Sequence, residues 1–175
     1  MHTKYKGPIL IAMTAVLWST AGVLIKLVPW SAMTIVGLRS FFAAAVMAAF
    51  MRRPRITFSK PVILGGLSLS ATMVMFIFAN KLTTAANAIV LQYTSPIFVI
   101  LLSALMLRQR PRALDIAAVA VVFGGVMLFF IDQLRADALL GNILAVLSGV
   151  TFAGVFLANK MPGARPEEAT LLGYF

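Results

Sequence analysis

Long stretches of apolar residues alternate along the chain with short polar connections. The stretches lack the apolar–polar alternation of membrane-barrel strands. Each holds roughly 18–23 residues, enough for a helix to cross a hydrocarbon core of about 30 Å. The pattern predicts an all-α polytopic membrane helix bundle with six spans, at residues 7–28, 33–51, 61–82, 85–107, 114–131 and 139–161.

The composition agrees with a chain that lies mostly within a bilayer. The sequence is 61% hydrophobic, compared with about 45–50% in soluble domains. The absence of cysteine excludes disulfides, Cys-ligated zinc and thiol catalysis. Lys4 and Lys6 precede the first apolar stretch as in a signal peptide, but this stretch is too long and five more follow, so the first span is expected to be retained.

Positive charge is concentrated in every second connection, and cytoplasmic loops carry such an excess of Lys and Arg. This predicts a multi-pass membrane protein with a cytoplasmic N-terminus. The net charge of +10 is explained by these loops, so no nucleic-acid partner is expected. The inner side then holds Lys4, Lys6, Arg52, Arg53, Arg55, Lys60, Arg108, Arg110, Arg112, Lys160 and Arg165, and the outer side holds Lys26, Lys81 and Arg135.

The sixth span is weakly similar to the first. Residues 7–26 align without gaps on residues 141–160, and Trp18 then meets Phe152. A competing register pairs residues 21–23 with 153–155. If the sixth span repeats the first, the unit has five spans, and an odd number of spans inverts the second unit. Many secondary transporters have such inverted repeats, with the substrate site near the repeat interface.

The C-terminal residues 167–175 are typical of the beginning of another helix, with acidic residues in its first turn. We therefore interpret the chain as a piece of a longer protein. The alternative is a natural short tail that lies at the membrane interface.

Several stretches resemble the drug/metabolite transporter superfamily, in its ten-span EamA-type branch. They are Ala15-Val16-Leu17-Trp18-Ser19, Gly37-Leu38-Arg39-Ser40-Phe41-Phe42, Ala85-Ala86-Asn87-Ala88, Thr94-Ser95-Pro96-Ile97-Phe98, Leu105-Met106-Leu107 and Gly124-Gly125-Val126.

This resemblance implies two five-span repeats that move small metabolites across the bacterial inner membrane, often outward. Residues 1–131 would form the first repeat, and residues 139–175 would begin the second. One position departs from the family, because Arg108-Gln109 stands where members commonly have Gly-Glu after the fourth span. Any helix-end pairing by that glutamate is not expected here.

Arg39 is a candidate site residue because it lies inside the second span. A charge within the membrane is costly and normally faces a cavity or a partner. Its guanidinium could pair with a substrate carboxylate or phosphate, or act as a conformational lock. Alternatively, Arg39 extends to the outer interface or binds a helix-end carbonyl.

The fourth span has a polar break in its middle. Pro96 removes a backbone donor and frees a carbonyl near Gln92, and such irregular backbone is tolerated where it is buried or lines water. Asn87 lies seven residues before Thr94, which predicts a shared face. The candidate cavity-lining residues here are Asn87, Gln92, Tyr93, Ser95 and Pro96, and the alternative is interhelical hydrogen bonding with a simple kink.

Trp18 and Ser19 lie in the middle of the first span, away from the interfacial belt in which Trp is usually enriched. Trp18, with Gly22 one turn later, predicts an aromatic wall beside a recess. The alternative is ordinary helix packing.

None of the five acidic residues lies deep in a span, so this chain offers no central carboxylate for proton-coupled transport of lipophilic cations. No nucleophile–base pair, metal cluster or phosphate loop is apparent, which predicts no enzyme activity and no cofactor. The expected partners are the lipid bilayer, a small-molecule substrate such as an amino acid or a related zwitterionic or anionic metabolite, and a missing second half or a second copy. Two alternatives remain: a membrane interaction subunit that transports nothing, and a half-size transporter that works as a dimer.

Overall fold

The structure is a computed structural model that describes residues 6–51, 56–108, 110–130 and 138–175. The side chains of Lys6, Ile11, Ala15, Ser19, Phe129 and Phe130 lie outside this description. Within the described ranges all regular structure is helical, which confirms the predicted all-α class.

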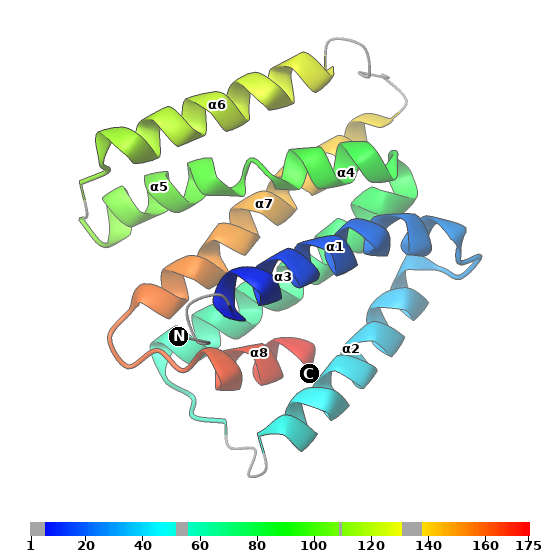
Figure 1. The fold of residues 1–175 in the computed structure, drawn as a ribbon. Coiled ribbons are helices and arrows are strands. Elements are labelled where there is room, and N and C mark those ends of the chain that lie inside the picture. The colour runs from blue at the N-terminus through cyan, green and yellow to red at the C-terminus, as the bar shows by residue number, and fades with distance from the viewer. Residues whose placement is uncertain (1–5, 52–55, 109, 131–137) are drawn as a thin grey trace.

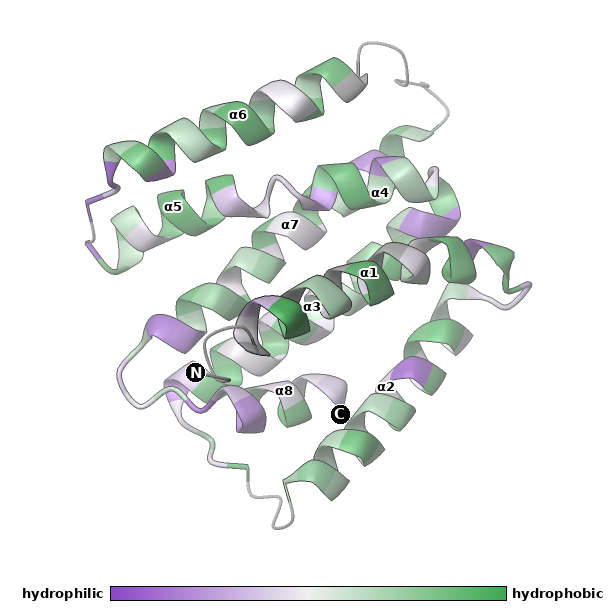
Figure 2. Cartoon of the chain, viewed as in Figure 1, coloured by the Kyte–Doolittle hydropathy of each residue, from purple (hydrophilic) through white to green (hydrophobic). Residues whose placement is uncertain are grey.

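In the part of the chain that the structure describes, eight helices follow one another (Figure 1). Among the described residues, five apolar segments are long enough to cross a membrane, with α4 and α5 counted together. Helix α6 contains a shorter apolar segment, Ala113–Leu128. Hydrophobic residues cover most of each long helix, and hydrophilic residues gather near helix ends (Figure 2). The helices are α1 (Lys6–Leu27), α2 (Ala32–Phe50), α3 (Lys60–Leu82), α4 (Ala85–Gln92), α5 (Ser95–Met106), α6 (Ala113–Phe130), α7 (Leu139–Lys160) and α8 (Pro166–Tyr174).

Helix α7 is the centre of the packing, since it lies against α3, α4 and α5 (Figure 1). Small residues recur at every fourth position of α7, at Ala145, Gly149 and Ala153, and all three are buried. Such residues let helix backbones approach closely in a membrane. Helix α6 packs on α5 at one edge of the bundle, and the short α8 lies against α3 and α2.

Two lysines tie the last turns of α1 and α3 together. Lys26 Nζ donates to the carbonyl oxygens of Asn80 and Thr83, at 3.2 and 2.8 Å. In return, Lys81 Nζ donates to the carbonyl oxygen of Val28 at 2.6 Å. The last carbonyls of a helix have no partner within the helix and carry partial negative charge, so a cation is stabilising there. Each helix therefore supplies the cation that caps the other.

A buried polar cluster joins the α3–α4 turn to the beginning of α7. The Thr83 hydroxyl donates to Asn142 Oδ1 at 2.9 Å and lies 3.4 Å from Asn87 Nδ2, which donates to it. Gly141 makes this approach possible, because a Cβ there would stand 2.8 Å from Thr83 N. The beginning of α7 is thus fixed by direct backbone contact.

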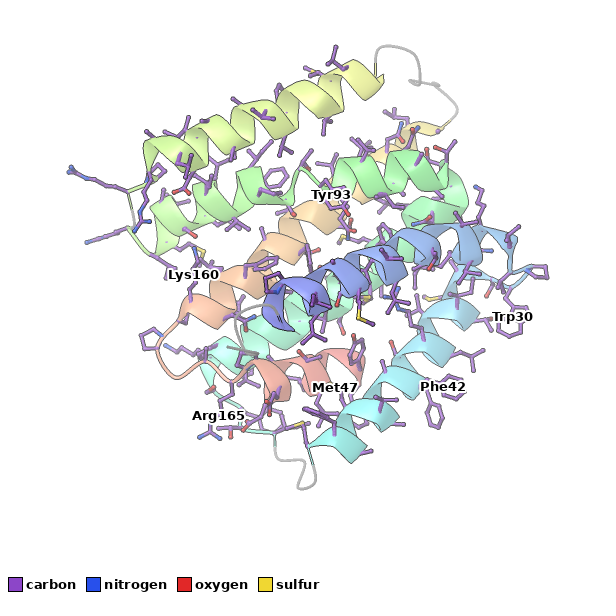
Figure 3. All side chains as sticks on the ribbon, in the orientation of Figure 1. Trp30, Phe42, Met47, Tyr93, Lys160 and Arg165 are labelled. Carbon is purple, nitrogen blue, oxygen red and sulfur yellow. The ribbon has the colours of Figure 1, made fainter. Side chains whose placement is uncertain are left out.

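At the opposite end, the connection between α2 and α3 is bound to α8. Glu168 accepts a hydrogen bond from Thr57 N at 2.7 Å and pairs with Arg165 at 2.8 Å. Arg165 also donates to the Thr57 hydroxyl at 3.2 Å. Figure 3 shows Arg165 at the start of α8. The Arg165 hydrogen bond, and after it the Thr57 amide, lower the pKa of Glu168 from its ordinary 4.5.

Candidate functional site

The predicted break in the fourth span divides it into two helices, α4 and α5. Helix α4 ends at Gln92 and α5 begins at Ser95, with Pro96 in its first turn, where its missing N–H is not needed. Tyr93 lies at this break (Figure 3). Gly149 of α7 packs directly against it, because a Cβ on Gly149 would stand 3.1 Å from Gln92 O.

A cavity of about 190 Å³ opens beside the break. This volume is below the roughly 300–1,000 Å³ of pockets for drug-sized ligands, so it suits a small metabolite. Its lining comes from α1, α2, α3, α4, α5, α7 and the break itself. The lining residues are Trp18, Ala21, Arg39, Thr72, Met73, Phe76, Ile89, Gln92, Tyr93, Ser95 and Phe152.

Aromatic rings form much of this wall. The ring centroids of Trp18 and Phe152 are 5.7 Å apart, with the rings tilted by 49°. Phe152 in turn packs edge-on against Phe156 at 5.1 Å. These distances are typical of favourable aromatic pairs. Trp18 and Tyr93 keep 44% and 57% of their surface exposed, so the described residues cover neither ring completely.

Arg39 carries the only formal charge among the lining residues. It lies seven residues after the start of α2, roughly 10 Å along the helix axis, and is half-buried. Within the described residues its guanidinium makes no hydrogen bond or ion pair, so its donors remain available to a solute. Gln92 and Ser95 add neutral polar groups, while the Thr72 hydroxyl is held 2.7 Å from Ser68 O and 2.8 Å from Thr151 Oγ1.

Five of the eight residues predicted for the site lie together in this wall: Trp18, Arg39, Gln92, Tyr93 and Ser95. Their role in substrate binding stays a prediction. The side chain of Ser19 lies outside the described residues.

Asn87 and Pro96 lie outside the lining. Asn87 is buried in the first turn of α4, where its backbone N donates to the N-cap hydroxyl of Thr84 at 3.1 Å. The spacing argument placed Asn87 and Thr94 on one face of a continuous helix, but the break between α4 and α5 interrupts that helix. Pro96 is exposed in the first turn of α5.

The recess predicted beside Gly22 is filled. A Cβ at Gly22 would stand 2.9 Å from Ile89 Cδ1 and 3.4 Å from Asn80 Oδ1. The missing side chain of Gly22 therefore serves the packing of α4 on α1, while the open space lies on the side of Trp18.

The sequence analysis did not predict that α3 lines the cavity. Thr72, Met73 and Phe76 line the cavity from one face of this helix. The sequence signal was weak, because Thr72 is one of three hydroxyl residues in a mostly apolar stretch, with Ser68 and Ser70. Phe152 had a signal of another kind, since the repeat alignment paired it with Trp18.

Within the described part of the chain, no group of three or more His, Cys, Asp or Glu side chains gathers as a metal site. The arrangement is therefore one of apolar contact, amide and hydroxyl hydrogen bonding, and one guanidinium.

Comparison with known proteins identifies the family of the chain. A model of the EamA-like transporter family matches residues 5–131. The chain is 28% identical over 158 residues to an uncharacterized transporter of Archaeoglobus fulgidus, covering 88% of this chain and 56% of that protein. It is 31% identical over 149 residues to the pseudopaline exporter CntI of Pseudomonas aeruginosa, covering 81% of this chain and 51% of that protein.

The chain thus spans about half the length of the curated relatives it matches. No solved structure matches it. The family model covers more than half of the chain, and the described helices are long and apolar enough to span a membrane. The chain therefore belongs to the EamA-like transporter family, and it is a multi-pass membrane protein.

Proposed function

We propose that the protein exports small zwitterionic or anionic metabolites, amino acids or related compounds, across the inner membrane. The observation that carries this proposal is the cavity beside the α4–α5 break, whose only charge is the guanidinium of Arg39. A guanidinium pairs with a carboxylate through two parallel hydrogen bonds. Gln92 and Ser95 supply further polar groups, and the aromatic wall suits an apolar side chain.

The proposed mechanism is alternating access between two inverted repeats. In the repeat alignment Trp18 corresponds to Phe152, and the two rings contact each other. Equivalent residues of two units related by a two-fold axis touch each other only near that axis. This contact supports a pseudo-two-fold axis beside the cavity, the position in which transporters of this kind hold their substrate.

Residues 1–131 then form the first repeat and residues 139–175 the start of the second, which a further segment or a second copy would complete. The outward direction is proposed by analogy with the relative named as an exporter. A subunit that transports nothing would need Trp18, Gln92 and Tyr93 to pack without space between them, and the cavity argues against it.

Transport from proteoliposomes tests the proposal. Vesicles containing the protein are loaded with a mixture of amino acids and small carboxylic acids, and the external medium is followed by mass spectrometry. We expect at least one compound to leave several-fold faster than from protein-free vesicles. If protein shown to be helical by circular dichroism accelerates the release of none of them, the proposal fails.

A further inference from the structure

A second cavity, of about 180 Å³, lies where α5, α6 and α7 meet. It shares no lining residue with the first cavity. Lys160, at the end of α7, lies on the side of the molecule where α5 turns into α6 (Figure 3). The residues that line this second cavity are Val99, Ile100, Ser103, Arg110, Pro111, Asp115 and Lys160.

Cations outnumber carboxylates in this cavity. Arg110 and Lys160 face one acid, Asp115, whose Oδ2 accepts a hydrogen bond from Arg112 N at 3.0 Å. Across the part of the chain that the structure describes, the sole ion pair joins Arg165 to Glu168. Arg110 and Lys160 therefore keep their charge without a carboxylate partner there.

A hydroxyl completes the set of donors. Lys160 Nζ lies 3.5 Å from the Oγ of Ser103, which is 6% exposed. A guanidinium fork, an ammonium and a hydroxyl around one space match the three acceptor oxygens of a phosphate group. Asp115 weakens the positive field, and its bond to the Arg112 amide directs the carboxylate toward the start of α6, where negative charge is stabilised.

The surroundings of the cavity are apolar and exposed. Leu101 and Leu105 of α5, and Leu114 and Ile116 of α6, leave 58%, 79%, 79% and 56% of their surface uncovered. In a bilayer such residues face acyl chains. The positive-inside rule places this end of the bundle at the cytoplasmic leaflet, which carries anionic lipids, and basic pockets between spans on that side bind lipid head groups.

We propose that this basic cavity binds a phosphate group, that of an anionic phospholipid of the inner leaflet. Arg110 and Lys160 hold the phosphate, Ser103 donates to it, and the acyl chains lie along α5 and α6. This site is independent of the proposed export, because none of its residues touches the first cavity.

Native mass spectrometry of the purified chain with added lipid tests the site. We expect phosphatidylglycerol to bind at least tenfold more tightly than phosphatidylcholine. Since each charge near the surface is worth about 1 kcal/mol, the double variant Arg110→Gln/Lys160→Gln should lose about 30-fold in affinity. Lys81→Gln, which removes a cation at the opposite, outer end of α3, should change the affinity less than about twofold, because this attraction falls off within a Debye length.

A second variant tests the site even if the double variant fails to fold. Asp115→Asn keeps an acceptor for the Arg112 amide but removes the negative charge, so it should bind phosphatidylglycerol about fivefold more tightly. Equal binding of the two lipids, or full retention of phosphatidylglycerol by the double variant, would overturn the proposal. Equally tight binding of free glycerol phosphate would overturn the lipid assignment and leave a soluble phosphate ester as the ligand.

Discussion

Arg39 gives a fixed positive charge to a cavity wall that is otherwise neutral. The cost of this charge in an apolar environment is recovered only when an anion or a ring of acceptors surrounds it. In the described residues no such partner is supplied, so the cavity is suited to a solute that brings its own carboxylate.

Replacing Arg39 by Ala should reduce transport by roughly 10- to 100-fold, since a charge-assisted hydrogen bond is worth about 1.5–3 kcal/mol. Membrane insertion should be unchanged. The measurement is release from proteoliposomes, with protein content determined by immunoblot.

Phe42→Ala is the matched control for Arg39. Phe42 follows Arg39 by about one turn of α2, is 63% exposed and points away from the bundle (Figure 3). Its replacement should leave transport within about twofold, because the lost side chain contacts lipid rather than solute. If Arg39→Ala transports as well as Phe42→Ala, the guanidinium has a structural role only.

Helix α7 depends on small residues where it meets its neighbours. Gly141 touches the α3–α4 turn and Gly149 touches the α4–α5 break, and in both cases the nearest atoms include backbone. Backbone atoms cannot rotate away as a side-chain end can. Substitution at these positions must therefore displace whole segments.

Gly141→Ala should destabilise the protein by about 1–3 kcal/mol, the usual cost of overpacking. Its added Cβ would stand 2.8 Å from Thr83 N. Gly124→Ala serves as the control because a Cβ there meets nothing within 4 Å, so higher helix propensity should leave stability unchanged or slightly raised. Thermal unfolding in detergent, followed by size-exclusion chromatography, distinguishes the two. Equal melting temperatures would contradict the close contact.

The lysine ties at the ends of α1 and α3 can be tested in the same way. Lys26→Met keeps the length of the side chain and removes both hydrogen bonds to α3, which should cost about 1 kcal/mol of stability. Lys60→Met, at the other end of α3, is the control because Lys60 makes no side-chain hydrogen bond within the described residues. A variant Lys26→Met as stable as Lys60→Met would show that the ties contribute nothing.

The helices could be predicted from the sequence, whereas half of the cavity wall could not. A span needs a long apolar stretch, and Pro96 marks the break, so both features are evident in the chain. Thr72, Met73 and Phe76 were missed because every face of a membrane helix is apolar. Periodicity therefore does not distinguish a cavity-facing side from one facing lipid. Asn87 was predicted for the wall on the assumption of one continuous helix. The break between α4 and α5 changes which residues share a face, and the sequence does not give the angle between these two helices.

Glu168 joins two distant parts of the chain, since it links α8 to the connection between α2 and α3, 111 residues away in sequence. Because its pKa is lower in the folded protein than the ordinary 4.5, the folded state favours the charged carboxylate. This stabilisation is complete above that ordinary pKa and is lost as the pH falls through the lower folded value.

Glu168→Gln should weaken the hydrogen bond between the Thr57 amide and residue 168 at neutral pH, and it should make the strength of this bond independent of pH. Hydrogen exchange at the Thr57 amide, which donates to Glu168 at 2.7 Å, reports on it directly. We expect the wild type to protect this amide at pH 7 and to lose protection as the pH falls from 4.5 through the lower pKa of the folded protein. The neighbouring Glu167→Gln, an exposed acid in the same turn, should behave as the wild type. Identical exchange in both variants would contradict the link.

The paired lysines also limit the routes by which a solute could leave the cavity. Ala21 and Phe76, which line the cavity from α1 and α3, each lie five residues before Lys26 and Lys81, roughly 8 Å along their helices. Separating α1 from α3 above the cavity would break three hydrogen bonds to helix-end carbonyls. Helix α2 reaches the cavity through Arg39, which makes no hydrogen bond among the described residues. For the proposed transport, we therefore expect the solute to leave between α2 and the joined pair of α1 and α3.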